Sequence, residues 1–330
     1  KYQNKKKIDR YIWMYVIAFS VFIAYALIRH MGYGLNNQQA SNYVVTPFYN
    51  DHTSYGAVLA LLFPVLISLF VAYRNIRLSH KVLFLGLLGY FIFAILFSYT
   101  RAAWVSLIGA FGVWALIKLK IRFHFVLLGA AALIGLYFTF QTEILMQLEQ
   151  NRQDSSGKFS EHVQSISNIS TDASNLERIN RWNSAIRMFR ERPVFGWGPG
   201  TYMFQYAPYQ RSYQRTIIST NTGSMGNAHS EYLGPLSESG VLGMVSVILI
   251  IIATIFTAFR VYYNTKQRKV KILSLGLLLG LITYYIHGIL NNFLDTDKAS
   301  ALFWGFTAML VAMDIYHREK KNTKSPTSSS

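Results

Sequence analysis

Long apolar runs recur along this chain, and they are the clearest pattern in it. The runs cover residues 11–28, 54–73, 82–98, 102–117, 123–140, 241–259, 272–290 and 300–316. A helix needs about 20 mostly apolar residues to cross the hydrocarbon core of a bilayer. The pattern therefore predicts an all-α polytopic membrane protein with eight transmembrane helices.

The hydrophilic stretches between the runs predict the domain organisation. Residues 1–140 are expected to hold five spans, and residues 241–317 three more. Between them, residues 141–240 form one large extracytoplasmic loop, which is predicted to be mobile at first and then to carry amphipathic helices. The Lys- and Ser-rich residues 318–330 are expected to be a disordered cytoplasmic tail.

Composition narrows the possible classes. The chain is 52% hydrophobic and only 14% charged, whereas soluble proteins carry about 25% charged residues. It has no cysteine, which excludes a disulfide framework and a thiolate metal site. The sequence shows no evident cluster of metal ligands, so no metal and no cofactor are expected.

The net charge of +17 reflects how the chain is expected to be oriented in the membrane. Cations concentrate on the tails and short loops that lie on one side of the predicted spans, and the opposite side sums to about zero. The positive-inside rule assigns the basic side, with both ends of this chain, to the cytoplasm. The charge therefore indicates a cytoplasmic membrane, with the lipid bilayer as partner, and no nucleic acid.

An amphipathic helix is predicted within the loop. Ser174–Glu177 fits a capping box, and Pro193 should end the helix. Five apolar residues share one face, which favours core or membrane-surface packing: Leu176, Ile179, Trp182, Ile186 and Phe189. Arg178 and Arg181 share another face, which a solvated helix surface or an anion site would both explain. The following turn, 193–200, has three glycines that allow close backbone approach.

A single histidine stands where the loop leads into the sixth span. Asn227 is expected to cap a helix over 228–239, with His229 in its first turn and Gly240 ending or bending it. The positive end of the helix dipole would favour a neutral imidazole there, as a general base requires. Glu231 and Glu238 are candidates to orient His229 or to pair with arginines, although a lone histidine is more often structural.

Other polar residues stand at the predicted outer ends of spans. Arg101 lies between two spans, where it either snorkels or clamps an anion. His52, with Asp51, either is solvated at the interface or faces a site. Asn291 follows the seventh span and is expected to face the bundle interior.

Three motifs together resemble the O-antigen ligase family of membrane glycosyltransferases. The first is His229-Ser230, nine residues, Gly240, two residues and Gly243; the second joins Arg178 and Trp182 to Pro193-Val-Phe-Gly-Trp-Gly198. The third is Arg101, although Val105 replaces the leucine that is common in the family. The resemblance covers about residues 80–315. The family usually has more spans, so N-terminal spans are expected to be absent from this chain.

The resemblance implies a metal-independent, inverting transfer on the periplasmic face of a bacterial inner membrane. The donor would be a glycan on undecaprenyl diphosphate, with Arg101, Arg178 and Arg181 binding the diphosphate. His229 would be the general base, and the possible supporting residues are Asn227, Glu231, His52 and Asn291. These groups would need to converge within about 15 Å.

The acceptor is open. A lipid A-core sugar, as in a ligase, is favoured, and the alternatives are a growing glycan, as in a polymerase, or a protein, as in an O-oligosaccharyltransferase. A lipid-linked glycan transporter is the competing class. Transporters tend to place ionisable groups at mid-membrane, whereas here these groups cluster at the outer boundary.

Overall fold

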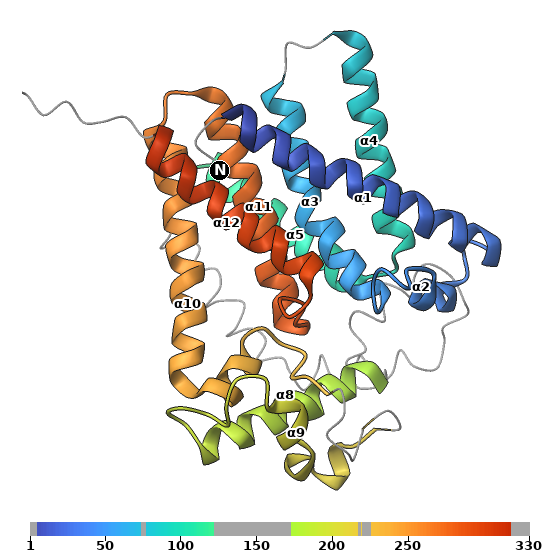
Figure 1. The fold of residues 1–330 in the computed structure, drawn as a ribbon, viewed down its shortest axis with the longest axis vertical. Coiled ribbons are helices and arrows are strands. Elements are labelled where there is room, and N and C mark those ends of the chain that lie inside the picture. The colour runs from blue at the N-terminus through green and yellow to red at the C-terminus, as the bar shows by residue number, and fades with distance from the viewer. Residues whose placement is uncertain (1–4, 74–76, 122–172, 217–218, 220–225, 318–330) are drawn as a thin grey trace, which may run out of the picture. The chain divides into compact units, whose positions relative to one another are not determined.

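The described part of the chain is helical throughout. The computed structural model describes residues 5–73, 77–121, 173–216, 219 and 226–317, and it contains no strand within them (Figure 1). The helices are α1 (Lys5–Tyr33), α2 (Gln38–Val44), α3 (His52–Ala72), α4 (Leu78–Phe97), α5 (Arg101–Lys118), α8 (Ala173–Glu191), α9 (Tyr202–Gln205), α10 (Leu233–Asn264), α11 (Arg268–Leu290) and α12 (Asp297–His317), with short 3-10 turns η1 (Ala207–Tyr209) and η2 (Ser212–Gln214).

Seven of the eight predicted spans are helices. Among the described residues, seven helices are long and apolar enough to cross a membrane: α1, α3, α4, α5, α10, α11 and α12. The all-α polytopic fold class is therefore confirmed. The predicted span 123–140, the first part of the loop and the tail 318–330 lie outside the described residues.

The chain forms two compact units. The first contains Lys1–Ala110, Ser246–Gly288 and Phe293–Ser330, and the second contains Phe111–Val245 and Ile289–Asn292. The last helices thus join the N-terminal helices in one unit, although the sequence pattern separates them. Each unit is described by itself.

The first unit is built around α3 and α11, which are its most buried spans. Two glycines of α11 bring the helix backbones together. Gly276 lies against Ser68, and a Cβ on Gly280 would stand 2.5 Å from the carbonyl oxygen of Leu61. Small residues at such positions are typical of helix packing in membranes, where close backbone approach replaces the hydrophobic driving force.

Ion pairs join several helix ends of the first unit. Lys269, at the start of α11, donates to Asp9 of α1, and the Tyr73 hydroxyl also donates to Asp9. Arg260 of α10 pairs with Asp314 of α12, with Nε and Oδ1 2.9 Å apart. All five residues stand at helix ends that the charge pattern assigns to one side. The upper part of Figure 1 shows these ends together.

The second unit buries a polar face of α8, which the sequence analysis did not predict. The buried residues of α8 are Glu177, Asn180, Arg181, Ser184, Ala185 and Met188. The expected apolar face, represented by Ile179, Trp182 and Ile186, is only half-buried. The prediction that this apolar face forms the core of the loop is therefore wrong for this unit. Membrane-surface packing, its alternative, is not tested by this burial.

Candidate functional site

Arg181 stands at the centre of the polar core of the second unit. Its Nε donates to Glu177 Oε1 at 2.6 Å, and its guanidinium lies 4.0 Å from the ring centroid of Tyr206. The Tyr202 hydroxyl donates to the Arg181 carbonyl oxygen at 2.8 Å, and the Tyr202 ring stacks on Tyr206. Arg181 is only 5% exposed, so a solvated helix face does not describe it.

The carboxylate of Glu177 holds this core together. Besides Arg181, it accepts hydrogen bonds from the hydroxyls of Thr216 and Ser219. Burial alone would raise the pKa of Glu177, but the hydrogen bonds from Ser219 and Arg181 outweigh burial and lower the pKa. The expected capping box does not mark the helix start, because α8 begins at Ala173, one residue before Ser174.

The segment that leads to His229 is pressed against the same core. A Cβ on Gly226 would stand 2.6 Å from the Tyr206 ring and would clash with the Arg181 guanidinium. Two residues later, Ala228 is buried among Tyr202, Tyr206, Ala185 and Met188. The chain can pass this close only because residue 226 has no side chain, and Arg181 thereby fixes the start of the turn.

His229 lies on a strained turn that two side chains hold. Its φ is +47°, a left-handed conformation that is uncommon for residues other than glycine. The His229 amide donates to Asn227 Oδ1 at 3.0 Å, and Trp182 Nε1 donates to the His229 carbonyl oxygen at 3.3 Å. The histidine is half-buried. Such strain persists only where the surroundings impose it, and it is enriched at functional sites.

The expected helix start at Ala228 is wrong. The helix α10 begins at Leu233, and Ser230 stands at its start, because Ser230 Oγ accepts from the amides of Tyr232 and Leu233. Asn227 instead forms a tight turn in which its side-chain oxygen accepts from the amide of His229, two residues on. His229 is thus outside the first turn of the helix, and the dipole argument for its neutral form loses its basis.

The bend at Gly240 is confirmed. Gly240 has φ +67° and ψ −158°, which separates a short helix, Leu233 to Ser239, from the long part of α10. Figure 1 shows the short helix turning away at the foot of α10. The kink is backed by the glycine turn after α8: the amides of Trp197 and Gly198 donate to the carbonyl oxygens of Ser237 and Glu238.

Arg178 lies on α8 one helical turn before Trp182. Residues at this spacing share one helix face, and Trp182 is the residue of that face that donates to the His229 carbonyl oxygen. Arg178 is half-buried, whereas Arg181 points into the core.

Three further acidic or amide residues belong to the second unit. The carboxylate of Glu231 adds to burial in raising the pKa of Tyr232 to about 12, so it lies close to that hydroxyl. Glu238 accepts from the amides of Gly200 and Tyr202 at 3.0 and 2.9 Å, and this places it at the start of α9. Asn291 is buried and is grouped with this unit.

The first unit brings Arg101 and His52 together. Arg101 is the first residue of α5 and is half-buried, and His52 is the first residue of α3. Thr100 Oγ1 donates to the His52 carbonyl oxygen at 2.8 Å, and Gly56 has no side chain that would push Thr100 away. Asp51 caps α3 by accepting from the amides of Thr53 and Ser54.

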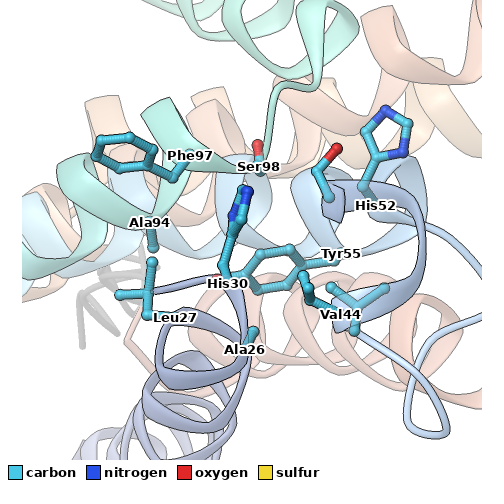
Figure 2. Close-up of a pocket in the computed structure, with 11 residues that line it drawn as sticks. Ala26, Leu27, His30, Val44, His52, Tyr55, Ala94, Phe97 and Ser98 are labelled. Atoms are coloured by element: carbon cyan, nitrogen blue, oxygen red, sulfur yellow. The ribbon is translucent and has the colours of Figure 1, made fainter. Parts of the chain in front are cut away.

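His52 also lines a pocket of the first unit. Figure 2 shows His30 and Tyr55 pointing into the pocket from α1 and α3, with His52 at its rim. His30 Nε2 lies 2.9 Å from the carbonyl oxygen of Asn37, which orients the ring. The remaining wall is mostly apolar, with Phe97 and Ala94 from α4.

The structure thus forms two groups from the predicted site residues. His229, Asn227 and Glu231 lie in one turn of the second unit, whose helix α8 also carries Arg178, and Arg101 and His52 lie together in the first unit. Convergence of the two groups within about 15 Å stays a prediction. Within the described residues, no three His, Cys, Asp or Glu side chains gather as a metal site would require.

The contacts that position His229 were not predicted. Trp182 belongs to the predicted apolar face and to the second motif, but neither assigns it a contact with His229, and no pattern singles out Gly226 or Tyr206. The signal for Trp182 was present in the Arg-x3-Trp spacing, because it places an indole N–H one turn after Arg178. No local pattern marks Gly226, since its neighbour in space is 45 residues away in the chain at Arg181.

The described part of the chain is that of an all-helical polytopic membrane protein. Its second unit is a structured loop that carries His229. A model of the O-antigen ligase family matches residues 86–248, just under half of the chain. This match confirms the resemblance that the motifs indicated, and it supports a membrane enzyme of the ligase or polymerase type. It includes Arg101, Arg178 and His229. His52, Asn291 and the last two spans lie beyond it, although the motifs had extended the resemblance to about residue 315.

One relative is similar over a shorter stretch. A Haemophilus influenzae protein described as uncharacterized is 26% identical over 133 residues, which is 40% of this chain and 32% of that protein. The alignment therefore spans about a third of the relative's own length. The match therefore shows similarity to a bacterial protein, but the description of that protein names no activity.

Proposed function

We propose that this chain transfers a glycan from undecaprenyl diphosphate to an acceptor hydroxyl on the periplasmic face of a bacterial inner membrane. The observation that carries the proposal is the His229 turn. A half-buried histidine is held in a strained conformation by Asn227 and Trp182, and Arg178 stands on the same side of α8. An imidazole beside a cation is suited to deprotonating a hydroxyl near a diphosphate.

In the proposed reaction, the His229 imidazole removes the proton from the acceptor hydroxyl. The acceptor oxygen attacks the anomeric carbon of the donor from the face opposite the diphosphate. The bond between the anomeric carbon and the diphosphate oxygen breaks, and undecaprenyl diphosphate leaves with the electron pair and inversion at carbon. No metal takes part, and the charge that develops on the leaving group is stabilised by arginine.

The arginines divide between two roles in this proposal. Arg178 and Arg101 bind the diphosphate, a role that the family resemblance implies for both and that suits half-buried arginines. Arg181, although the family motif suggests a third diphosphate ligand, is engaged with Glu177 and Tyr206. We therefore assign Arg181 to the support of the His229 turn. His52 would support Arg101, and Glu231 and Asn291 would line the site.

The acceptor proposed first is a sugar of the lipid A core, which makes the enzyme a ligase. Polymerisation of a surface glycan and glycosylation of a protein hydroxyl use the same donor and the same base, so they differ only in the acceptor. A transporter of lipid-linked glycans is the alternative without chemistry. All four are separated by what is released and which acceptor is required.

The test follows release of undecaprenyl diphosphate from a lipid-linked glycan by the protein in nanodiscs, with each acceptor in turn. His229→Ala is expected to lower the rate by about 100-fold or more, the usual contribution of general base catalysis. His80→Ala, at an exposed histidine of α4, is the matched control and is expected to keep the wild-type rate. Wild-type release by His229→Ala would overturn the role of His229, and flipping without release would favour the transporter.

A further inference from the structure

The turn between α8 and α9, residues 193–200, is fixed to α10 by its backbone. Trp197 and Gly198 donate to the carbonyl oxygens of Ser237 and Glu238 at 3.2 and 2.7 Å, and Val241 donates to Pro193 at 2.8 Å. A Cβ on Gly196 would stand 2.6 Å from the Ser239 amide nitrogen. The backbone of the turn is therefore held against residues 237–241 of α10.

That point of α10 is where the membrane-crossing segment begins. The chain has no charged residue between Glu238 and Arg260, and this length is close to the about 20 residues that a span requires. The span must therefore start next to Gly240. Apolar side chains of α10 are exposed from its first turn onward, as at Val241, Leu242 and Val245, which is the surface expected to meet lipid.

The turn adds exposed apolar side chains at the same level. Phe195 is 76% exposed and Val194 is 49% exposed. The backbone of Val194 packs directly on Gly240, where a Cβ would clash with the Val194 carbonyl group. These side chains continue the lipid-facing surface of α10 rather than form a separate patch.

A cation and an indole flank the exposed phenylalanine. The Arg192 guanidinium lies 3.8 Å from the ring centroid of Trp197, and Trp197 Nε1 donates to the Met188 carbonyl oxygen at 3.1 Å. Tryptophan and arginine with an apolar stem and a polar head are typical of the boundary between headgroups and hydrocarbon. The pair is thus chemically matched to lipid phosphates.

We propose that residues 193–197, which we call the interfacial wedge, insert into the bilayer beside α10. Phe195 and Val194 enter the upper acyl region, and Arg192 with Trp197 remains at the level of the lipid phosphates. The occupant of this surface is the lipid bilayer, because the wedge is continuous with a membrane-spanning helix. The wedge fixes the height of α8 above the membrane, and it does so whether or not His229 is catalytic.

Site-directed spin labelling tests the wedge directly, since the 330-residue chain has no cysteine that would take the label elsewhere. Labels at Phe195→Cys and, as a second variant, Val194→Cys are compared in nanodiscs with two references. Leu249→Cys lies on the exposed side of the α10 span, and Ser212→Cys is exposed on η2. The measurement is the accessibility of each nitroxide to oxygen, which concentrates in lipid, and to a water-soluble nickel complex.

The expected result is that the ratio of oxygen to nickel accessibility at positions 195 and 194 resembles that at position 249 and is several-fold higher than that at position 212. A ratio equal to that at position 212 would overturn the proposal, because the wedge would then be in water. An immobilised label with low accessibility to both reagents would also overturn it, in favour of a protein partner. Since no activity is measured, these outcomes are independent of the glycosyltransferase proposal.

Discussion

The core of the first unit is apolar, with aliphatic and aromatic side chains, whereas the buried face of α8 in the second unit carries Glu177, Arg181 and Asn180. In the first unit, glycines bring α3 and α11 together and charges are confined to helix ends. In the second unit, an ion pair and an aromatic stack form the centre. An apolar helix face therefore does not by itself identify the core: in α8 the polar face is buried, and the apolar face is only half-buried.

The largest expected loss of stability is that of the second unit in Glu177→Ala. This change leaves the Arg181 cation buried without its carboxylate, and breaking a buried ion pair in this way costs about 3–5 kcal/mol. The measurement is hydrogen exchange of the α8 amides, which should lose protection. Asp314→Asn is the matched control: its partner Arg260 is partly exposed, so the cost should be about 1 kcal/mol or less. Unchanged protection of α8 in Glu177→Ala would show that the polar centre does not hold the unit.

The second prediction concerns the glycine contact of the first unit. Gly280→Ala places a Cβ against the Leu61 carbonyl oxygen, and such overpacking costs about 1–3 kcal/mol. The apparent melting temperature in detergent should fall. Gly86→Ala in α4 is the control, because a Cβ there meets open space, and the melting temperature should stay the same or rise slightly. Equal behaviour of the two variants would contradict the close contact of α3 and α11.

The third prediction tests Trp182 as a positioning residue of the proposed site. Trp182→Phe keeps an aromatic ring but removes the hydrogen bond to the His229 carbonyl group, which is worth about 0.5–1.5 kcal/mol. If the His229 turn serves catalysis, kcat should fall up to about tenfold while KM for the donor stays constant. Trp304→Phe, at an exposed tryptophan of α12, should change neither. A rise in KM with an unchanged kcat would instead give Trp182 a part in donor binding.

The smallest expected effect is the pH dependence of the second unit. Because the folded state lowers the pKa of Glu177 below its ordinary value of 4.5, its carboxylate contributes stability that is fully present above that value. This stability is lost as the pH falls through the lower pKa of the folded state. Tryptophan fluorescence of the second unit, followed from neutral pH downward, should show a transition in acid. Glu177→Gln should remove the contribution of this group, and an identical transition in that variant would assign it to another residue.

Much of the fold could be predicted from the sequence because a membrane span is a local pattern. A long apolar run without charge has few other structures available to it, and α3, α10 and α11 follow directly from such runs. The kink at Gly240 could also be predicted, because only glycine readily adopts its positive φ. The predicted start of the helix before this kink, at Ala228, was wrong, because Ser230 rather than Asn227 accepts from the amides at the helix start.

The candidate site was predictable in its residue types and not in its geometry. The motifs marked Arg178 and His229, and the resemblance added Arg181 as a diphosphate ligand, but the spacing does not tell which of the two arginines of α8 is buried. That depends on Glu177, Tyr206 and Gly226, which come together only through tertiary contacts. The role of Trp182 depends in the same way on a hydrogen bond to a backbone group 47 residues further on.

The kink at Gly240 has a mechanical consequence. The His229 turn leads into the short helix Leu233 to Ser239, which meets the long part of α10 at a single glycine and is backed by the turn after α8. A span longer or shorter than the surrounding hydrocarbon adjusts by tilting. Tilting of the first turns of the long part of α10 is therefore expected to shift the short helix that follows the His229 turn. Membrane thickness, set by acyl-chain length and by neighbouring lipids, becomes a variable to which this part of the protein responds.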